Sequence, residues 1–268
     1  MQAEPRFATL NTTFQNPIID FPDRRIRQAF PSRSKRVAAP GHASPNLSQP
    51  RKPTMILDPA SMDSLNRYKV LIGSIVPRPI ALVSTLSLDG VRNLAPFSFF
   101  AGVGSNPMTL LFCPANKPDG TEKDSLRNAK PASEGGTGEF VVNIVPHAIA
   151  RPMAACAEPL GPEESEFDLS GLTPTASTLV RPPRVEQSPV AFECVTRQVI
   201  RTNGQAPGAG NIVIGEVVSV FVRDELINDR FHIDAAALDA IGRMGGTGYC
   251  TTRDRFEIPM GREALRGG

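Results

Sequence analysis

A strand, a turn and a second strand are encoded within residues 77–98, and this signal constrains the fold more than any other part of the chain. The aliphatic and β-branched run Ile80–Thr85 predicts a buried strand, and the Asp-Gly pair at 89–90 predicts a tight turn. The returning segment Asn93–Ser98 contains Pro96, which has no backbone N–H and so interrupts strand pairing. Backbone amides of this returning segment are therefore expected to face a ligand.

Segments rich in Val, Ile and Phe recur along the chain, and Gly, Pro, Asn or Asp bound each of them, which is typical of strands. The expected strands are Ile80–Leu86, Phe97–Val103, Met108–Cys113, Phe140–Val145, Val190–Ile200 and Ile212–Val222. Many strands with few helices predict an all-β fold, a barrel or a sandwich, rather than a doubly wound sheet.

Helices are expected at three short segments, Lys123–Lys130, His147–Cys156 and Asp234–Ile241. The last has Asp234 as its N-cap and Gly242 as the residue just past its end. The stretch Leu160–Gln187 is rich in Pro, Glu and Ser, and it is expected to be a long loop.

The strand expected at Ile212–Val222 is apolar on both faces, so it should be covered on both sides. Strict alternation of side chains predicts that Val213, Val217 and Phe221 share one face.

The N-terminal part of the chain differs from the rest in charge and proline content. Residues 1–54 carry nine Lys or Arg, three Asp or Glu and eight prolines, whereas the remainder carries twenty basic and twenty-four acidic residues. This composition predicts a disordered basic extension, or a translation start at Met55 or Met62, ahead of one domain over residues 55–268. A targeting peptide is the alternative for this segment.

Charge, hydropathy and cysteine spacing exclude several classes of protein. The acidic balance of residues 55–268 argues against nucleic-acid binding, and no apolar run approaches the roughly 20 residues needed to span a bilayer. Cys113, Cys156, Cys194 and Cys250 form no C-x-x-C pair, so their spacing encodes neither a zinc site nor a redox dithiol. A reducing, cytoplasmic location is expected.

The usual nucleotide and metal signatures are missing from the sequence. The stretch Gly102–Pro107 has proline where a dinucleotide-binding loop has its third glycine, and there is no Walker loop and no H-E-x-x-H motif. The three histidines, His42, His147 and His232, are too sparse for a metal cage and are expected to be structural.

Two motifs combine the residue types that a phosphorylated, planar ligand would need. Lys123-Asp124-Ser125 offers a cation, a hydroxyl and free N–H groups at a helix start, as a phosphate monoester requires, although the same residues could simply cap the helix. In Asn93–Ser98, Leu94 and Ala95 could form an apolar wall for a flat ring, with Asn93 and Ser98 as polar contacts. The alternative for the second motif is a bulged strand.

These motifs resemble the flavin reductase-like family of FMN-binding split β-barrels. The resemblance extends from Pro77–Ser98 through Lys123–Asn128 and Gly138–Asn143 to Arg243–Gly246, in the order that the family shows. It implies a split-barrel fold, usually a homodimer, with FMN at the subunit interface.

The resemblance also implies roles for individual residues. Lys123, Asp124 and Ser125 match the Lys-Asp-Thr of the family that approaches the FMN phosphate, with Ser in place of Thr. Asn93, Leu94, Ala95 and Ser98 correspond to contacts with the flavin. The remaining cofactor-binding residues that it implies are Arg78, Ser84, Thr85 and Arg243.

The function implied is transfer of a hydride from NADH or NADPH to bound FMN, and from there to free flavin or another small acceptor. Hydride transfer needs proximity rather than a proton-transferring side chain, so no catalytic residue is assigned. An FMN-binding electron carrier or sensor that does not use nicotinamide remains the alternative. Relatives often have His at position 211, where this chain has Asn211, so a different reaction partner would follow if that position touches the substrate.

Overall fold

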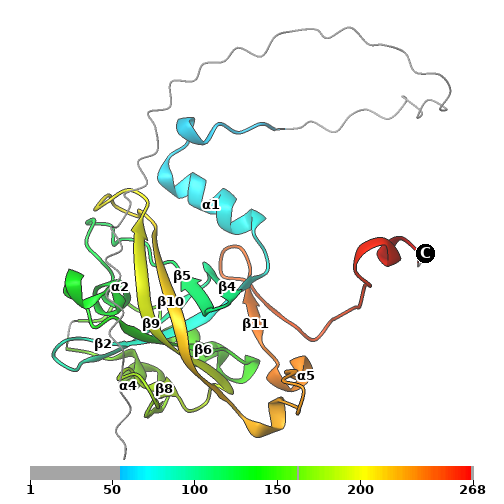
Figure 1. Ribbon diagram of the computed structural model, residues 1–268. Coiled ribbons are helices and arrows are strands. Elements are labelled where there is room, and N and C mark those ends of the chain that lie inside the picture. Colours follow the sequence, from blue (N-terminus) through cyan, green and yellow to red (C-terminus); the bar gives the residue numbers. More distant parts are fainter. Residues whose placement is uncertain (1–54, 162, 267–268) are drawn as a thin grey trace, which may run out of the picture.

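The computed structural model describes residues 55–161 and 163–266, and its main feature is one antiparallel sheet of seven strands (Figure 1). Along the sheet the order is β3-β2-β6-β9-β10-β5-β4. The strands are β2 (Ala81–Leu86), β3 (Arg92–Phe97), β4 (Phe100–Ser105), β5 (Met108–Phe112), β6 (Glu139–Ile144), β9 (Val190–Arg201) and β10 (Asn211–Val222). The predicted 1–54 extension lies outside the described residues.

The sheet closes on itself into a barrel. Its two edge strands, β3 and β4, are consecutive in the chain and are joined only by Ser98 and Phe99. Phe97 of β3 also lies 5.2 Å, ring centre to ring centre, from Phe112 of β5, although four strands separate β3 from β5 in the sheet order. Such a contact across the sheet requires strong curvature, as in small barrels.

Two small sheets flank the barrel. β1 (Arg78–Pro79), β11 (Ile241–Arg243) and β12 (Tyr249–Thr251) form one of them, and β7 (Pro174–Thr175) pairs with β8 (Arg184–Val185) to form the other. The first of these sheets brings the start of the domain against its C-terminal part.

The helices in the described chain are short, apart from α1. They are α1 (Ser64–Ser74), α2 (Asp124–Ala129), α3 (Ala150–Ala155), α4 (Glu166–Ser170) and α5 (Ala235–Leu238). Single 3₁₀ turns occur at Pro59–Ser61, Ala132–Glu134, His147–Ile149, Asp224–Leu226 and Gly261–Leu265. Asp63, Ser165 and Asp234 cap α1, α4 and α5 through their side chains, as N-cap residues of these types commonly do.

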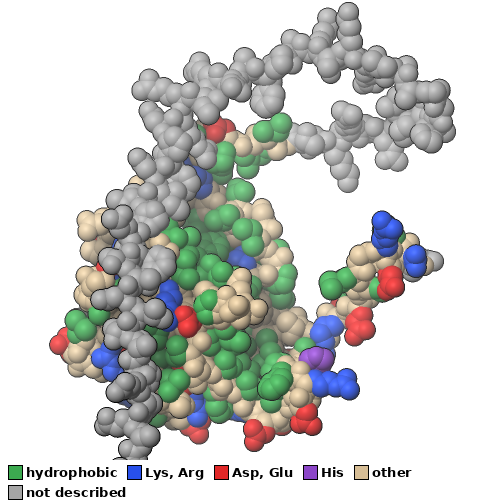
Figure 2. All heavy atoms as spheres, in the orientation of Figure 1, with side chains coloured by type: hydrophobic (Ala, Val, Ile, Leu, Met, Phe, Trp, Pro, Cys, Tyr) green, Lys and Arg blue, Asp and Glu red, His purple; other side chains and the backbone are tan. Residues whose placement is uncertain are grey.

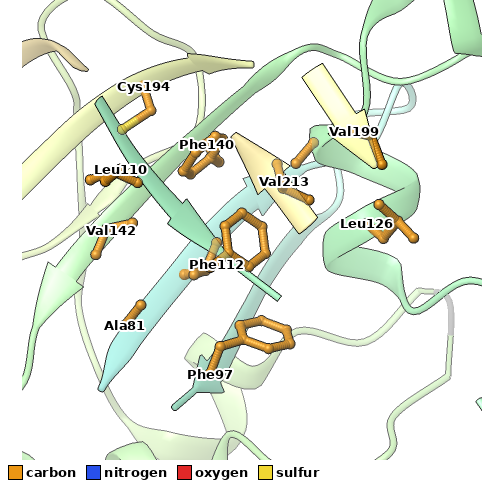
Figure 3. Close-up of a cluster of buried hydrophobic side chains, with 12 residues drawn as sticks. Ala81, Phe97, Leu110, Phe112, Leu126, Phe140, Val142, Cys194, Val199 and Val213 are labelled. Carbon is orange, nitrogen blue, oxygen red and sulfur yellow. The ribbon is translucent and has the colours of Figure 1, made fainter. Parts of the chain in front are cut away.

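The barrel interior is filled by apolar side chains from nearly every strand and from α2 (Figure 3). Phe112 lies at the centre, with its ring 5.0 Å from Phe140 and 5.2 Å from Phe97, and Leu126 of α2 closes one end. A second cluster on the outer face of β2 and β3 packs these strands against α3 and α4. The sheet is therefore covered on both sides near β3, the strand that carries the predicted flavin motif.

The all-β class and five of the six expected strand segments are confirmed, and the first corrections concern the sixth segment and a helix end. The segment predicted as a strand at Phe97–Val103 contains the end of β3, a two-residue link and most of β4. The helix α5 ends at Asp239, which adopts a left-handed conformation, so the prediction that Gly242 ends this helix is wrong: Gly242 is in β11.

Three further corrections concern faces and unassigned segments. Phe221 does not share a face with Val213, because a register shift between Val217 and Ser219 skips one residue of β10 and reverses the alternation. Phe221 packs outside the barrel while Val213 packs inside. The segment expected as a long loop at Leu160–Gln187 includes α4, β7 and β8, and α1 had no prediction.

Apolar side chains stay exposed on α1 and on the C-terminal segment. Leu65, Tyr68 and Leu71 of α1 are about half exposed, and the arm from residue 253 onward runs away from the barrel (Figures 1 and 2). Phe256 and Met260 of this arm are 84% and 92% exposed. A search of the described residues for a helix long and apolar enough to cross a membrane finds none.

Candidate functional site

The start of α2 presents donors without a capping side chain. Lys123 occupies the N-cap position, where its side chain makes no capping hydrogen bond. The backbone N–H groups of the first helical turn, at Asp124 and Ser125, have no acceptor within the helix. Lys123 is exposed and forms no ion pair within the described chain, whereas Asp124 pairs with Lys117 and Arg127. This donor set suits an anion.

A buried cluster of four polar side chains lies directly behind this helix start. The Asn93 side-chain amide donates to Thr85 Oγ1 at 3.1 Å and to Ser125 Oγ at 3.0 Å, and the Asn128 amide donates to Thr85 Oγ1 at 3.1 Å. All four side chains are less than a tenth exposed. The structure thus brings together three residues that the sequence predicted for the site, namely Thr85, Asn93 and Ser125. The sequence predicted no role for Asn128, which ends the matched segment Lys123–Asn128. Its i, i+3 spacing from Ser125 places both residues on one helix face.

Strand alternation separates the other predicted residues of β2 and β3 from this cluster. Thr85 is paired with Asn93, and Ser84 with Leu94, so the second pair faces the opposite side of the sheet. Ser84 donates its hydroxyl to the Pro183 carbonyl, and Leu94 is fully buried against the outer helices. Ala95 packs toward the barrel interior.

The edge of β3 is not open to a ligand at Leu94. Its outward N–H donates at 2.8 Å to Glu166 Oε2, a carboxyl group that is only 8% exposed. Burial raises the pKa of Glu166 above its ordinary value, and the charge of Asp124 adds to this effect, although the Leu94 N–H opposes it. Nothing in the sequence signalled Glu166, because it falls in a segment expected to be a loop.

Two adjoining hollows lie outside the polar cluster. Both are lined by Ser87, Val91, Arg127 and Asn128, and the larger has a volume of about 270 Å³. The smaller also reaches Asn93, Asp124 and Glu166. Polar groups of α2 and of the β2–β3 turn therefore converge on one depression at the Asn93 end of β3.

Arg78 and Ser98 lie together at the opposite end of β3. The Arg78 side chain is 3% exposed and donates to Ser98 Oγ at 3.1 Å and to the carbonyls of Ile72, Ile75 and Met244. These four acceptors fix the end of α1 to the β11–β12 segment, so the structure places Arg78 as a buried link between segments of the chain.

A third hollow, of about 230 Å³, opens beside Ser98. Its wall includes Pro96, Met153, Tyr68, Arg243 and Tyr249. The guanidinium of Arg243 lies 4.5 Å from the centre of the Tyr249 ring, within the range of a cation–π interaction. Ser98 and Arg243, which the resemblance assigned to the cofactor, thus line a different hollow from the one that Asn93 and Asp124 line.

Asn211 is buried and bonded within the chain. Asn211 is 1% exposed and donates to the Pro114 carbonyl and to Asn116 Oδ1, so it anchors a neighbouring loop and does not touch a substrate. A search of the described residues for groups of three or more metal-ligating side chains finds none.

Comparison with known proteins identifies the family. Residues 72–237 match the model of the flavin reductase like domain, and the chain belongs to this family. An uncharacterized protein of Aquifex aeolicus is 36% identical over 182 residues, which cover 68% of this chain and 88% of that protein. The uncharacterized protein YwrF of Bacillus subtilis is 36% identical over 200 residues, covering 74% and 94%.

Solved structures agree with this assignment and show the split-barrel fold. The nitrilotriacetate monooxygenase component B of Bacillus cereus is 33% identical, with a TM-score of 0.71, and the match covers 77% of this chain and all of that chain. The Pseudomonas fluorescens 2-nitrobenzoate 2-nitroreductase NbaA is 29% identical, with a TM-score of 0.67, covering 78% and 97%. The protein is thus a flavin reductase-like oxidoreductase in general terms.

Proposed function

We propose that this protein binds FMN, reduces it with NADH or NADPH, and passes the electrons to free flavin or another small acceptor. The observation that carries the proposal is the uncapped start of α2. Here Lys123, which forms no ion pair among residues 55–161 and 163–266, lies next to the polar cluster of Thr85, Asn93 and Ser125. The similarity to a monooxygenase component B and to a nitroreductase supports electron transfer to a second reactant.

The residues at the start of α2 fit a phosphate monoester. Lys123 and the first-turn N–H groups would hold its oxygens, since all are donors and none must lose a partner first. Ser125 and Thr85 already accept from the Asn93 amide, so their hydroxyl protons remain to be donated. Asp124 is already paired with Lys117 and Arg127, so it would leave the Lys123 ammonium group available to the phosphate.

When bound, FMN would supply the hydride acceptor, a chemistry that protein side chains lack. The role of the chain is to hold and orient the reactants, so no residue is given an acid–base role. Ser98, which lines a hollow at the other end of β3, remains our candidate for a contact with the ring.

We also propose a cytoplasmic homodimer. Leu65 and Leu71 of α1 and the apolar side chains of the C-terminal arm are exposed, and a second copy would cover them. The four cysteines are free thiols, which suits a reducing compartment.

Calorimetric titration of the full-length protein with FMN and with riboflavin tests the phosphate site. We expect Lys123→Ala to weaken FMN about tenfold or more, because a charge-assisted hydrogen bond contributes about 1.5–3 kcal/mol, and to leave riboflavin affinity unchanged. Lys69→Ala, a change of an exposed lysine on α1, is the matched control. Equal wild-type affinities for FMN and riboflavin would refute the assignment.

Anaerobic stopped-flow mixing with NADH and with NADPH tests the reductase activity. We expect one of them to bleach the bound flavin. Bleaching by dithionite but by neither nicotinamide would replace the reductase with the alternative, an FMN-binding electron carrier or sensor.

A further inference from the structure

The hollow beside Ser98 combines flat apolar walls with positive charge. Tyr68, Phe97, Pro96 and Met153 supply apolar surface from α1, β3 and α3, and Tyr249 adds a second phenol ring. None of its lining residues is an aspartate or glutamate. Arg243 is the one charged residue among them. Its guanidinium donates a hydrogen bond to the Gly246 carbonyl.

A second arginine lies directly behind this wall. Arg78 of β1 and Arg243 of β11 are opposite each other in the small sheet, a pairing of like charges that destabilises a strand pair. Arg78 has only hydroxyl and carbonyl acceptors, and neither arginine forms an ion pair with a carboxylate in the described part of the chain. Two uncompensated cations at one site favour binding of an anion there.

The hollow is large enough for a single ring. A cavity of about 150 Å³ holds one benzene molecule, so a hollow of about 230 Å³ accommodates one ring with its substituents. Tyrosine rings and a guanidinium plane both bind flat partners by stacking.

We propose that this hollow binds a single-ring aromatic carboxylate, or an aromatic ligand with an equivalent anionic group, as the second reactant beside the flavin. The ring lies against the tyrosines, and the anionic group pairs with Arg243 in the field of Arg78. This inference rests on the proposed function, because a second reactant needs a bound flavin with which to exchange electrons. Binding of the aromatic ligand is measured separately from binding of FMN.

Benzoate is the probe, titrated into the full-length protein with and without saturating FMN. The chain has two tyrosines, Tyr68 and Tyr249, and both line the hollow, so 3-fluorotyrosine labelling gives two ¹⁹F signals that report on this site alone. We expect benzoate to shift both signals. Benzamide, which keeps the ring without the charge, and cyclohexanecarboxylate, which keeps the charge without the flat ring, should each bind at least tenfold more weakly.

Variants separate charge recognition from structural effects. Arg243→Gln should remove the preference for benzoate over benzamide, and Arg243→Lys should restore part of it. Arg230→Gln, at an exposed arginine that does not line the hollow, is the control and should keep the full preference. Arg78→Gln is avoided as the main test because that side chain is buried and joins three segments.

Each outcome decides between the two proposals. Equal binding of benzoate and benzamide, or displacement of benzoate by FMN, overturns the inference. FMN binding without benzoate binding refutes this inference alone, and benzoate binding without FMN binding refutes the proposed function alone.

Discussion

Replacing Glu166 tests whether this buried carboxyl group holds the edge of β3 in place. Its Oε2 atom accepts the Leu94 N–H at 2.8 Å, and the group is 8% exposed. In Glu166→Ala the N–H loses its acceptor, which costs about 1–3 kcal/mol for a buried donor. At about 2–4 °C per kcal/mol for a domain of roughly 200 residues, the melting temperature should fall by about 2–12 °C at low pH, where wild-type Glu166 carries its proton.

Glu166→Gln separates the acceptor from the charge. Burial raises the pKa of Glu166 in the folded protein above its ordinary value of 4.5, so the folded state binds this proton more tightly than the unfolded state. The stability from this proton is therefore fully present below pH 4.5 and is lost as the pH rises through the folded pKa. Glutamine keeps a side-chain oxygen that accepts the Leu94 N–H, and because it does not titrate, it loses no stability as the pH rises.

Thermal unfolding of wild type and both variants at pH 4.5 and pH 8 checks the reasoning. At pH 8 Glu166→Gln should be at least as stable as wild type, and lowering the pH should favour wild type relative to Gln. If Gln and Ala destabilise equally at pH 8, the N–H acceptor is not what Glu166 contributes. If the difference between wild type and Gln is independent of pH, the raised pKa is refuted.

Three further predictions follow from packing and composition. Deleting residues 1–54 should leave the melting temperature and the FMN affinity nearly unchanged, since their composition gives them little to bury; a lower melting temperature would show that they pack on the barrel. Gly215→Ala should lower the free energy of unfolding by about 1–3 kcal/mol in urea titration, because its Cβ would meet a core phenylalanine ring; unchanged stability would contradict this close packing. Phe256→Ala with Ile258→Ala should weaken dimerisation in sedimentation experiments, whereas Glu257→Ala between them should not; equal effects would refute an apolar face on the arm.

The sequence predicted the strands well because their apolar runs are local and bounded by turn residues. It missed α1, although Leu65, Tyr68 and Leu71 recur every three residues along this helix; none of its residues is buried in its own chain. The failure at Phe221 has another cause, since register shifts in β10 depend on pairing with β9, and alternation along one strand carries no information about its partner.

The site was predicted at the level of motifs and less well at the level of side chains. Lys123 and Ser125 lie where a helix start places them, since that signal is local. Arg78 could not be placed from sequence, because its acceptors come from α1, from Ser98 and from residue 244, which is 166 positions away.

Adjacent residues of a matched motif can have unrelated roles when a strand carries them. Ser84 and Thr85 both offer hydroxyls, and the resemblance assigned both to the cofactor, yet a strand turns them to opposite faces. Thr85 accepts two amide hydrogen bonds beside α2, whereas Ser84 donates to the Pro183 carbonyl across the outer core. Loss of the Thr85 hydroxyl would leave two buried amides without that acceptor next to the proposed phosphate site, so its effect should reach the ligand. Loss of the Ser84 hydroxyl affects the attachment of the 176–184 segment, and its effect should be confined to stability.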